Sequence, residues 1–139
     1  MNKNKWHFSD SKADRSVIKT FESQTNLELP KSYVRLAIES NGATPIMKKF
    51  HTQDGTLHIF NYLLDWDKNQ KDNIFLTYSS FSVEHEKNIV PFANDPFGNL
   101  ICFNFIENTK DPSIVYWDHE LDEFHLIKNR FEEFIHSLR

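Results

Sequence analysis

The sequence predicts an α+β domain, with helices near both ends of the chain and antiparallel strands between them. Apolar residues recur at helical spacing near the two ends, whereas the middle holds short runs rich in β-branched and aromatic residues. The connections between these runs are shorter than the dozen or so residues that a parallel crossover needs. No repeat, low-complexity tract or linker divides the 139 residues, which suit one domain. We therefore expect a single domain over residues 1–139, with residues 1–12 loosely ordered.

The first expected helix follows a polar N-terminal segment. Asp10 or Ser11 can cap it, and Asp14 is favourable near the positive end of the helix dipole. The helix should stop near residues 24–26. Its apolar positions are Val17, Ile18 and Phe21.

A second helix and a last helix complete the helical part of the prediction. Pro30 suits the first turn of the second helix, where its missing N–H costs nothing, and Asn41 with Gly42 can end this helix. Asn129 can cap the last helix, with Glu132 three residues on as in a capping box. The apolar stripe of this last helix is Phe131, Phe134, Ile135 and Leu138. Helices from both ends of the chain can then pack together on one face of the sheet.

Six short runs in the middle and later part of the chain are typical of strands. They are residues 46–51, 56–60, 89–92, 100–105, 114–117 and 123–127. Turn-forming residues separate them, and in one turn Asp95 can accept backbone N–H groups while Gly98 can take a positive φ. Residues 62–83 suit strand, turn or short helix equally well, so their structure stays open.

The net charge of −4 is unevenly distributed along the chain. Residues 1–83 carry eleven Lys or Arg against nine Asp or Glu, whereas residues 84–139 carry five against eleven. An acidic surface repels phosphate backbones, which disfavours direct binding of nucleic acid and favours a basic protein partner. Ordinary solubilising charge is the plainer interpretation, because small domains commonly carry a net charge of this size.

Cysteine usage and hydropathy indicate a cytoplasmic protein. Cys102 is the only cysteine and lies in an apolar run, where a buried thiol behaves as a small hydrophobe. The first ten residues lack the apolar core of a signal peptide, and no stretch approaches the roughly 20 apolar residues of a membrane span. We therefore expect a reducing compartment and no membrane partner.

No motif for catalysis, for a cofactor or for a metal emerges from the sequence. The seven histidines show no H-E-x-x-H pattern, the glycines form no phosphate-binding loop, and no G-x-S-x-G is present. Adjacent carboxylates have no apolar surroundings that would shift a pKa toward acid/base chemistry. A small hydrolase that uses His119 or His125 with a nearby carboxylate stays as a third alternative. We expect no enzyme activity, no cofactor and no metal.

Acidic residues beside tryptophans are the best candidates for a partner surface. Aromatic anchors flanked by charge suit interface hot spots, although Trp117 could equally belong to the core. The candidates are Asp65, Trp66, Asp67, Asp118, His119, Glu120, Asp122 and Glu123.

Four segments together resemble the SUKH superfamily, which includes bacterial immunity proteins and a fungal regulator of cell-wall glucan synthesis. Residues 29–33 (LPKSY), followed by 41–42 (NG), resemble its opening signature. Residues 91–99 (PFANDPFGN) resemble its P-x-A-x-D-x-x-G-N segment, and 114–120 (IVYWDHE) its V-x-x-W-D-H-E strand and turn. Residues 131–134 (FEEF) match its F-x-x-F helix.

The resemblance implies a curved antiparallel sheet of about five to six strands, with two N-terminal helices and one C-terminal helix packed on it. It also implies an immunity protein that binds and neutralises a cognate toxin, with a nuclease domain of basic surface as the expected partner. A regulatory scaffold that binds a cellular protein unrelated to toxins is the alternative, and dimerisation through a sheet edge stays open. Residues expected to form the framework rather than the contact surface are Pro30, Tyr33, Gly42, Asp95, Gly98 and Trp117.

Overall fold

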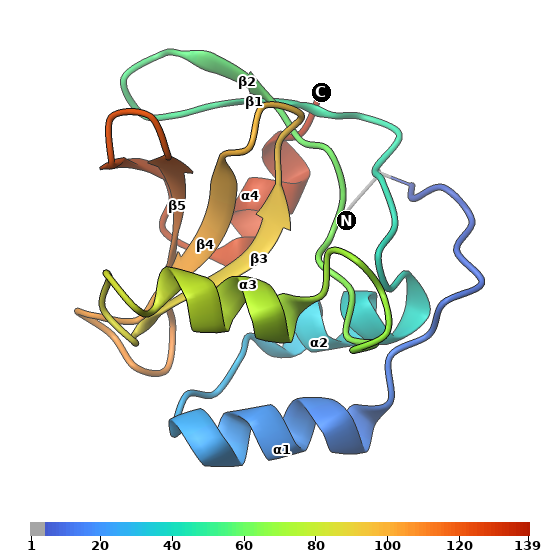
Figure 1. The fold of residues 1–139 in the computed structure, drawn as a ribbon. Helices are drawn as coiled ribbons and strands as arrows, with labels where there is room; N and C mark the ends of the chain where they lie inside the picture. Colours follow the sequence, from blue (N-terminus) through green and yellow to red (C-terminus); the bar gives the residue numbers. More distant parts are fainter. Residues whose placement is uncertain (1–4) are drawn as a thin grey trace.

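The computed structural model describes residues 5–139, and within them the chain forms four helices, a four-stranded antiparallel sheet and a two-stranded hairpin (Figure 1). The α+β class is therefore confirmed. The helices are α1 (Arg15–Thr25), α2 (Lys31–Glu39), α3 (Ile74–Phe81) and α4 (Phe131–Ser137). The strands are β1 (Lys49–His51), β2 (Leu57–Ile59), β3 (Ile89–Asn94), β4 (Leu100–Asn104), β5 (Ser113–Asp118) and β6 (Glu123–Lys128).

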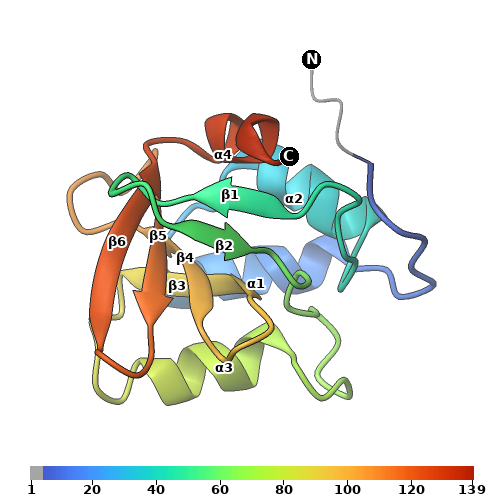
Figure 2. The same cartoon turned by 90° about the horizontal axis from the view of Figure 1, so that it is seen from above.

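The main sheet has the order β3-β4-β5-β6, and its two faces have different surroundings. One face carries Phe92, Phe103 and Tyr116 into the main core, where α2 and α4 pack. The other face carries Cys102 and Val115 toward Phe81 of α3. Figures 1 and 2 show α4 and α3 on opposite sides of the sheet. Side chains alternate between faces along a strand, so one short strand run supplies both surfaces.

The expected single curved sheet of five to six strands is wrong in two respects. The two earliest strands form a separate hairpin, in which Phe50 pairs with His58, and the four-stranded sheet is not curled. The outer backbone groups of Lys49 in β1 are engaged by the C-terminal residue, because Lys49 exchanges two hydrogen bonds with Arg139 at 2.9 and 3.0 Å. These groups are therefore not available to pair with a strand of the main sheet.

The segment whose structure the sequence leaves open contains α3 and a stretch that follows the β3 edge. Asn73 caps α3, because its side-chain oxygen accepts the Leu76 N–H at 2.9 Å. Before it, residues 61–64 hydrogen bond with residues 92–94 and cover the outer edge of β3. This coverage protects an otherwise open sheet edge.

Two helix starts differ from the expected ones. Asp14, not Asp10 or Ser11, caps α1 by accepting the Ser16 N–H at 2.9 Å. The Ser11 hydroxyl is engaged elsewhere, since it donates to Asp65.

The last helix begins after Arg130 and has no side-chain cap, so the expected Asn129 capping box is wrong. The Glu132 carboxylate accepts the Ser32 hydroxyl at 2.7 Å, which connects α4 to α2 instead.

The N-terminal segment contacts the loop after α2. Trp6 forms an isolated bridge with Pro45, and its ring lies edge-on to Phe60 at 5.7 Å. The His7 N–H donates to the Thr44 carbonyl at 2.9 Å. Of the segment expected to be loosely ordered, residues 1–4 lie outside the described residues, whereas 5–7 run beside 44–46.

Candidate functional site

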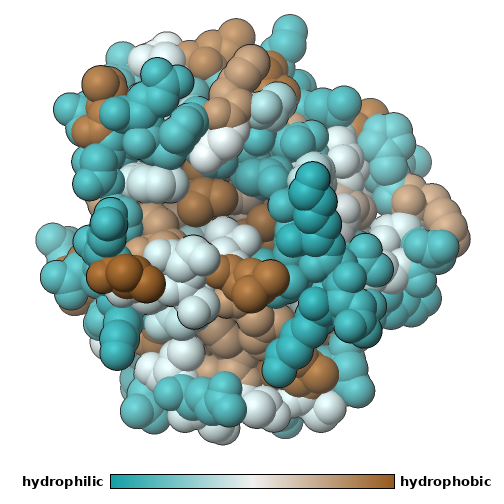
Figure 3. All heavy atoms as spheres, viewed as in Figure 1, coloured by the Kyte–Doolittle hydropathy of each residue, from teal (hydrophilic) through white to brown (hydrophobic). Residues whose placement is uncertain are grey.

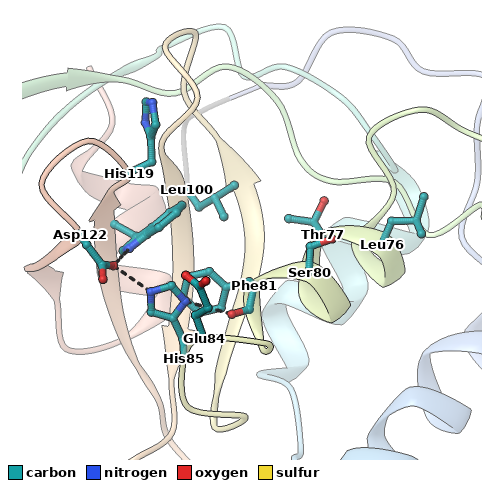
Figure 4. A pocket seen from close by; sticks show the side chains of 10 residues that line it. Leu76, Thr77, Ser80, Phe81, Glu84, His85, Leu100, His119 and Asp122 are labelled. Atoms are coloured by element: carbon teal, nitrogen blue, oxygen red, sulfur yellow. Dashed lines mark hydrogen bonds and ion pairs between the residues drawn. The ribbon is translucent and has the colours of Figure 1, made fainter.

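A groove of about 590 Å³ lies between α3 and the β5–β6 turn (residues 118–123). Its walls come from α3 and the two residues Glu84 and His85 that follow it, from β4 and β5, and from the turn (Figure 4). Figure 3 shows this side of the molecule, where apolar atoms are exposed among hydrophilic ones over α3 and in the hollow beside it. The lining residues are Leu76, Thr77, Ser80, Phe81, Glu84, His85, Leu100, Trp117, His119 and Asp122.

The floor of the groove is apolar because of strand register. Leu100 of β4 pairs with Trp117 of β5, so both side chains lie on the face of the sheet that α3 covers. The Phe81 ring meets Trp117 edge-on at a centroid distance of 5.2 Å and an interplanar angle of 87°. Such edge-to-face aromatic pairs are worth about 0.5–1.5 kcal/mol beyond their burial. The floor is thus a firmly packed aromatic surface.

One carboxylate oxygen joins the turn to α3 and the sheet. Asp122 Oδ1 accepts hydrogen bonds from Trp117 Nε1 at 2.7 Å and from His85 Nε2 at 2.8 Å (Figure 4). His85 Nδ1 lies 2.9 Å from the Phe81 carbonyl oxygen, and its ring stacks on Phe81 at 4.1 Å. Both ring nitrogens therefore face acceptors, an arrangement that suits the doubly protonated imidazolium.

The protonation of this pair follows from its contacts. Burial acts to lower the pKa of His85, but the hydrogen bond to Asp122, the Phe81 carbonyl and the charges of Asp122 and Glu84 outweigh it, so the pKa rises. The hydrogen bonds from His85 and Trp117 lower the pKa of Asp122. When His85 is protonated, the two side chains form an ion pair, and both nitrogens of His85 are engaged, so none is free to serve as a general base.

The β5–β6 turn is held in a defined conformation. Asp118 Oδ1 accepts the backbone N–H groups of Glu120 at 3.0 Å and Leu121 at 3.2 Å. Asp122 has a φ of 51°, a left-handed conformation that aspartate tolerates better than most side chains. The His119 N–H donates to Asn99 Oδ1 at 3.0 Å, which ties the turn to the β3–β4 connection.

A buried carboxylate organises that connection. Asp95 accepts the backbone N–H groups of Phe97 and Asn99 through one oxygen, and the Tyr116 hydroxyl at 2.7 Å through the other. Burial and the hydrogen bond to Asp95 raise the pKa of Tyr116. Gly98 has a φ of 91°, and a Cβ atom there would lie 3.2 Å from the His119 ring. The two motif segments, 91–99 and 114–120, therefore meet at the edge of the groove.

The acidic segment at residues 65–67 lies elsewhere and is mostly buried. Trp66 is 3% exposed, and its Nε1–H donates to the Tyr33 hydroxyl at 2.9 Å. Asp65 accepts hydrogen bonds from Asn41 Nδ2 at 2.7 Å and from the Asp67 N–H at 2.8 Å. The expectation that Trp66 anchors a partner from the surface is wrong, because its ring fills the core. Asp67 itself is exposed.

Of the predicted partner-binding residues, the structure brings together those of the β5–β6 turn. Two of them, His119 and Asp122, line the groove, and Trp117, expected only as framework, forms part of its floor. The other exposed members of the set are Glu120 and Glu123, with Asp118 half-buried. The contribution of α3 and the residues after it was missed, although Asn73 ahead of apolar positions 74, 78 and 81 was an available signal for a capped helix.

A second groove of about 520 Å³ lies between α1 and the segment that contains Trp66 and Asp67. Among residues 5–139, no three His, Cys, Asp or Glu side chains gather so as to hold a metal ion. No helix in that range is long and apolar enough to cross a bilayer. His125 of β6 lies outside the groove, 3.6 Å from the Glu123 carboxylate.

The fold is a small α+β domain with an open groove between α3 and the β5–β6 turn. The SUKH_6 family model, described as SMI1-KNR4 cell-wall, matches residues 15–135. The chain therefore belongs to the SUKH_6 family, which confirms the resemblance seen in the sequence. The SUKH family includes immunity proteins of polymorphic toxin systems, which are generally non-catalytic.

One curated protein shares part of this sequence. The SPbeta prophage-derived uncharacterized protein YokK of Bacillus subtilis (strain 168) is 39% identical over 74 residues. The aligned region covers 50% of this chain but only 36% of that protein. The similarity therefore concerns about a third of the relative's length.

Proposed function

We propose that this protein is a cytoplasmic immunity protein that binds and neutralises a cognate toxin with a nuclease domain. Its membership of the SUKH_6 family supports an immunity role. The prophage origin of the similar Bacillus subtilis protein agrees with a bacterial setting.

The observation that carries the nuclease part of the proposal is the acidic β5–β6 turn. Asp118, Glu120, Asp122 and Glu123 lie within six consecutive residues, and all but Asp118 are exposed. A nuclease needs a basic surface to hold its phosphate backbone, and an acidic protein surface competes for that surface. Charge of this kind also speeds encounter with a basic partner. Asp67, exposed but on another part of the surface, is a secondary candidate.

Co-expression with the toxin encoded by the adjacent gene tests this function directly. The C-terminal toxin domain should be tolerated by cells that contain the wild-type protein, co-purify with it, and lose its nuclease activity in the complex. A matched pair of variants localises the effect. Glu120→Lys/Glu123→Lys reverses charge in the turn, whereas Glu107→Lys/Glu133→Lys reverses it in the β4–β5 connection and on α4.

Each outcome has a clear meaning. Weaker protection by the turn variant alone supports the acidic turn as part of the contact surface. Protection that is weakened equally by the turn variant and by the control variant indicates a dependence on net charge alone. No complex and no protection by the wild-type protein would overturn the immunity function and favour a scaffold that binds an unrelated cellular protein.

A further inference from the structure

We infer that the groove between α3 and the β5–β6 turn receives one lysine or arginine side chain of the partner, with Trp117 beneath the side chain and Asp122 and Glu84 at its charged end. The inference rests on the proposed function for the nature of the partner as a toxin. The groove itself can be tested without that toxin.

The first support is the charge of the lining. The lining includes the carboxylates of Glu84 and Asp122, and none of its residues is Lys or Arg. The turn beside it contributes Asp118, Glu120 and Glu123. His85, which lines the groove and can carry a positive charge, is paired with Asp122. A cation that enters meets a site whose charge complements its own.

Asp122 retains capacity for a further hydrogen bond. Trp117 and His85 both donate to its Oδ1 atom, and the side chain remains 65% exposed. A carboxylate offers about four acceptor positions, so Oδ2 can accept an N–H from a guanidinium or ammonium group. The two existing bonds hold this carboxylate in place, which reduces the conformational entropy lost on binding.

The apolar surfaces suit the aliphatic part of a basic side chain. Phe81, Leu100 and Trp117 form the floor, and Leu76 on the α3 wall is 63% exposed. Lys and Arg bury their methylene stems on apolar surface while the charged head stays near water or a carboxylate. A cation near the face of a tryptophan adds an attraction of about 0.5–2 kcal/mol. The combination of aromatic floor and carboxylate rim is therefore more selective for a cation than for a neutral apolar side chain.

An NMR titration of the isotopically labelled full chain tests the groove with two small probes. N-acetyl-arginine amide carries the guanidinium charge, and N-acetyl-citrulline amide has nearly the same shape without it. We expect saturable shifts of the Trp117 indole N–H and the backbone amides of Glu84 and Asp122 with the arginine probe. The citrulline probe should bind at least about tenfold more weakly, since it loses the charge-assisted contacts.

Variants sharpen the result. Glu84→Gln/Asp122→Asn should weaken binding of the arginine probe at least about tenfold, the size of effect expected for lost charge-assisted hydrogen bonds. Glu107→Gln/Glu133→Gln, which removes two charges that do not line the groove, should leave binding unchanged. Leu76→Lys places a cation on the exposed wall of α3 and should also abolish binding, while its exposed position leaves folding intact.

Several outcomes would overturn the inference. Equal binding of both probes would indicate an occupant chosen for apolar shape, and concentration-dependent shifts at the groove without any probe would indicate a second copy of this chain. A toxin complex that forms with unchanged affinity in the groove variants would overturn the inference but leave the immunity function standing. Arginine binding at the groove without any toxin complex would support the groove as a cation site but overturn the immunity function.

Discussion

Two segments of this chain combine acidic residues with a tryptophan, and the fold uses them in opposite ways. In the segment 65–67, the Trp66 ring is 3% exposed and Asp65 is buried beside Asn41. At the end of β5 and in the turn that follows it, Trp117 is half-buried at the floor of an open groove and the Asp122 side chain is 65% exposed. The sequence pattern is nearly the same, yet one segment supports the core and the other borders a surface.

The difference lies in the donors that reach each carboxylate. Asp65 accepts from the Asn41 side chain, from the Ser11 hydroxyl and from the backbone of Asp67, so it joins three parts of the chain in the interior. Gly42 supports this approach, because a Cβ atom there would lie 2.7 Å from Asp65 Oδ2. Asp122 accepts hydrogen bonds from two side chains that line the groove, those of Trp117 and His85. A carboxylate with backbone and amide donors on several sides is structural, whereas one with a free side can bind a partner.

The largest expected effect separates the two tryptophans. Trp66→Ala should lower the free energy of unfolding by about 3–5 kcal/mol, the usual cost of removing a large aromatic core side chain. Trp117→Ala should lower the free energy of unfolding by less than Trp66→Ala does, since the Trp117 ring is partly solvated. It should weaken partner binding more than Trp66→Ala does. Urea unfolding followed by circular dichroism measures the first quantity, and titration with the toxin domain the second.

Trp66→Phe is the matched control for this prediction. It retains most of the ring but leaves the Tyr33 hydroxyl without the indole N–H, at a cost of about 1–3 kcal/mol. Equal losses of stability in Trp66→Ala and Trp117→Ala would contradict the proposed division between core and groove.

A smaller effect should separate the two aspartates. Asp65→Asn replaces one acceptor oxygen by an NH₂ group in a site already supplied with donors, and should cost about 1–3 kcal/mol of stability. Asp122→Asn should change stability little, because its site is open to water. Urea midpoints of the two variants at equal slope give the comparison. A larger loss for Asp122→Asn than for Asp65→Asn would show that the turn, rather than the 65–67 segment, holds the fold together.

Much of the fold could be predicted because local signals agree with it. The four late strands begin and end within two residues of their expected positions, since strand runs alternate with strong turn residues there. The separate hairpin could not be predicted, because the surroundings of β1 include bonds between Lys49 and Arg139, ninety positions apart in the sequence. The sequence does not identify helix α3, because Ile74, Phe75 and Tyr78 suit a strand equally well.

The site was also predictable only in part, because some of its contacts join residues that are far apart in the sequence. Adjacent acids in a turn are visible in the sequence, so the sequence singles out the β5–β6 turn as a candidate. The partnership of Asp122 with His85 could not be predicted, because 37 residues separate them and no spacing rule connects a helix end to a distant turn. The burial of Asp65 was equally invisible, since its donors Ser11 and Asn41 come from two other segments.

A pH-dependent effect, smaller still, should come from His85 and Asp122. The pKa of His85 is raised in the folded protein, so its contribution to stability is present below its unfolded pKa, about 6.5, and is lost as the pH rises through the folded value. The pKa of Asp122 is lowered, so its contribution is present above about 3.9 and is lost as the pH falls through the folded value. The pair therefore stabilises the fold most between about pH 4 and 6.5.

The variant His85→Gln tests this pH-dependent stabilisation. The difference in unfolding free energy between wild type and variant should be larger at about pH 5.5 than at about pH 8.5, as measured by urea unfolding in buffers of equal ionic strength. His136→Gln, on exposed α4 surface, is the control and should show no such change. A difference that grows toward alkaline pH would contradict the ion pair, because it would require a neutral His85 in the native state.

The smallest effect concerns the rate at which the partner is met rather than the strength of the final contact. Glu120→Lys/Glu123→Lys should slow association with the toxin domain about three- to tenfold at low salt and flatten its salt dependence, because exposed rim charges act mainly through steering. Stopped-flow mixing gives these rates, with Glu107→Lys/Glu133→Lys as the charge-matched control. Dissociation should be nearly unchanged, since neither carboxylate lines the groove. An unchanged association rate would place the encounter surface away from the turn, whereas faster dissociation would place Glu120 or Glu123 inside the contact itself.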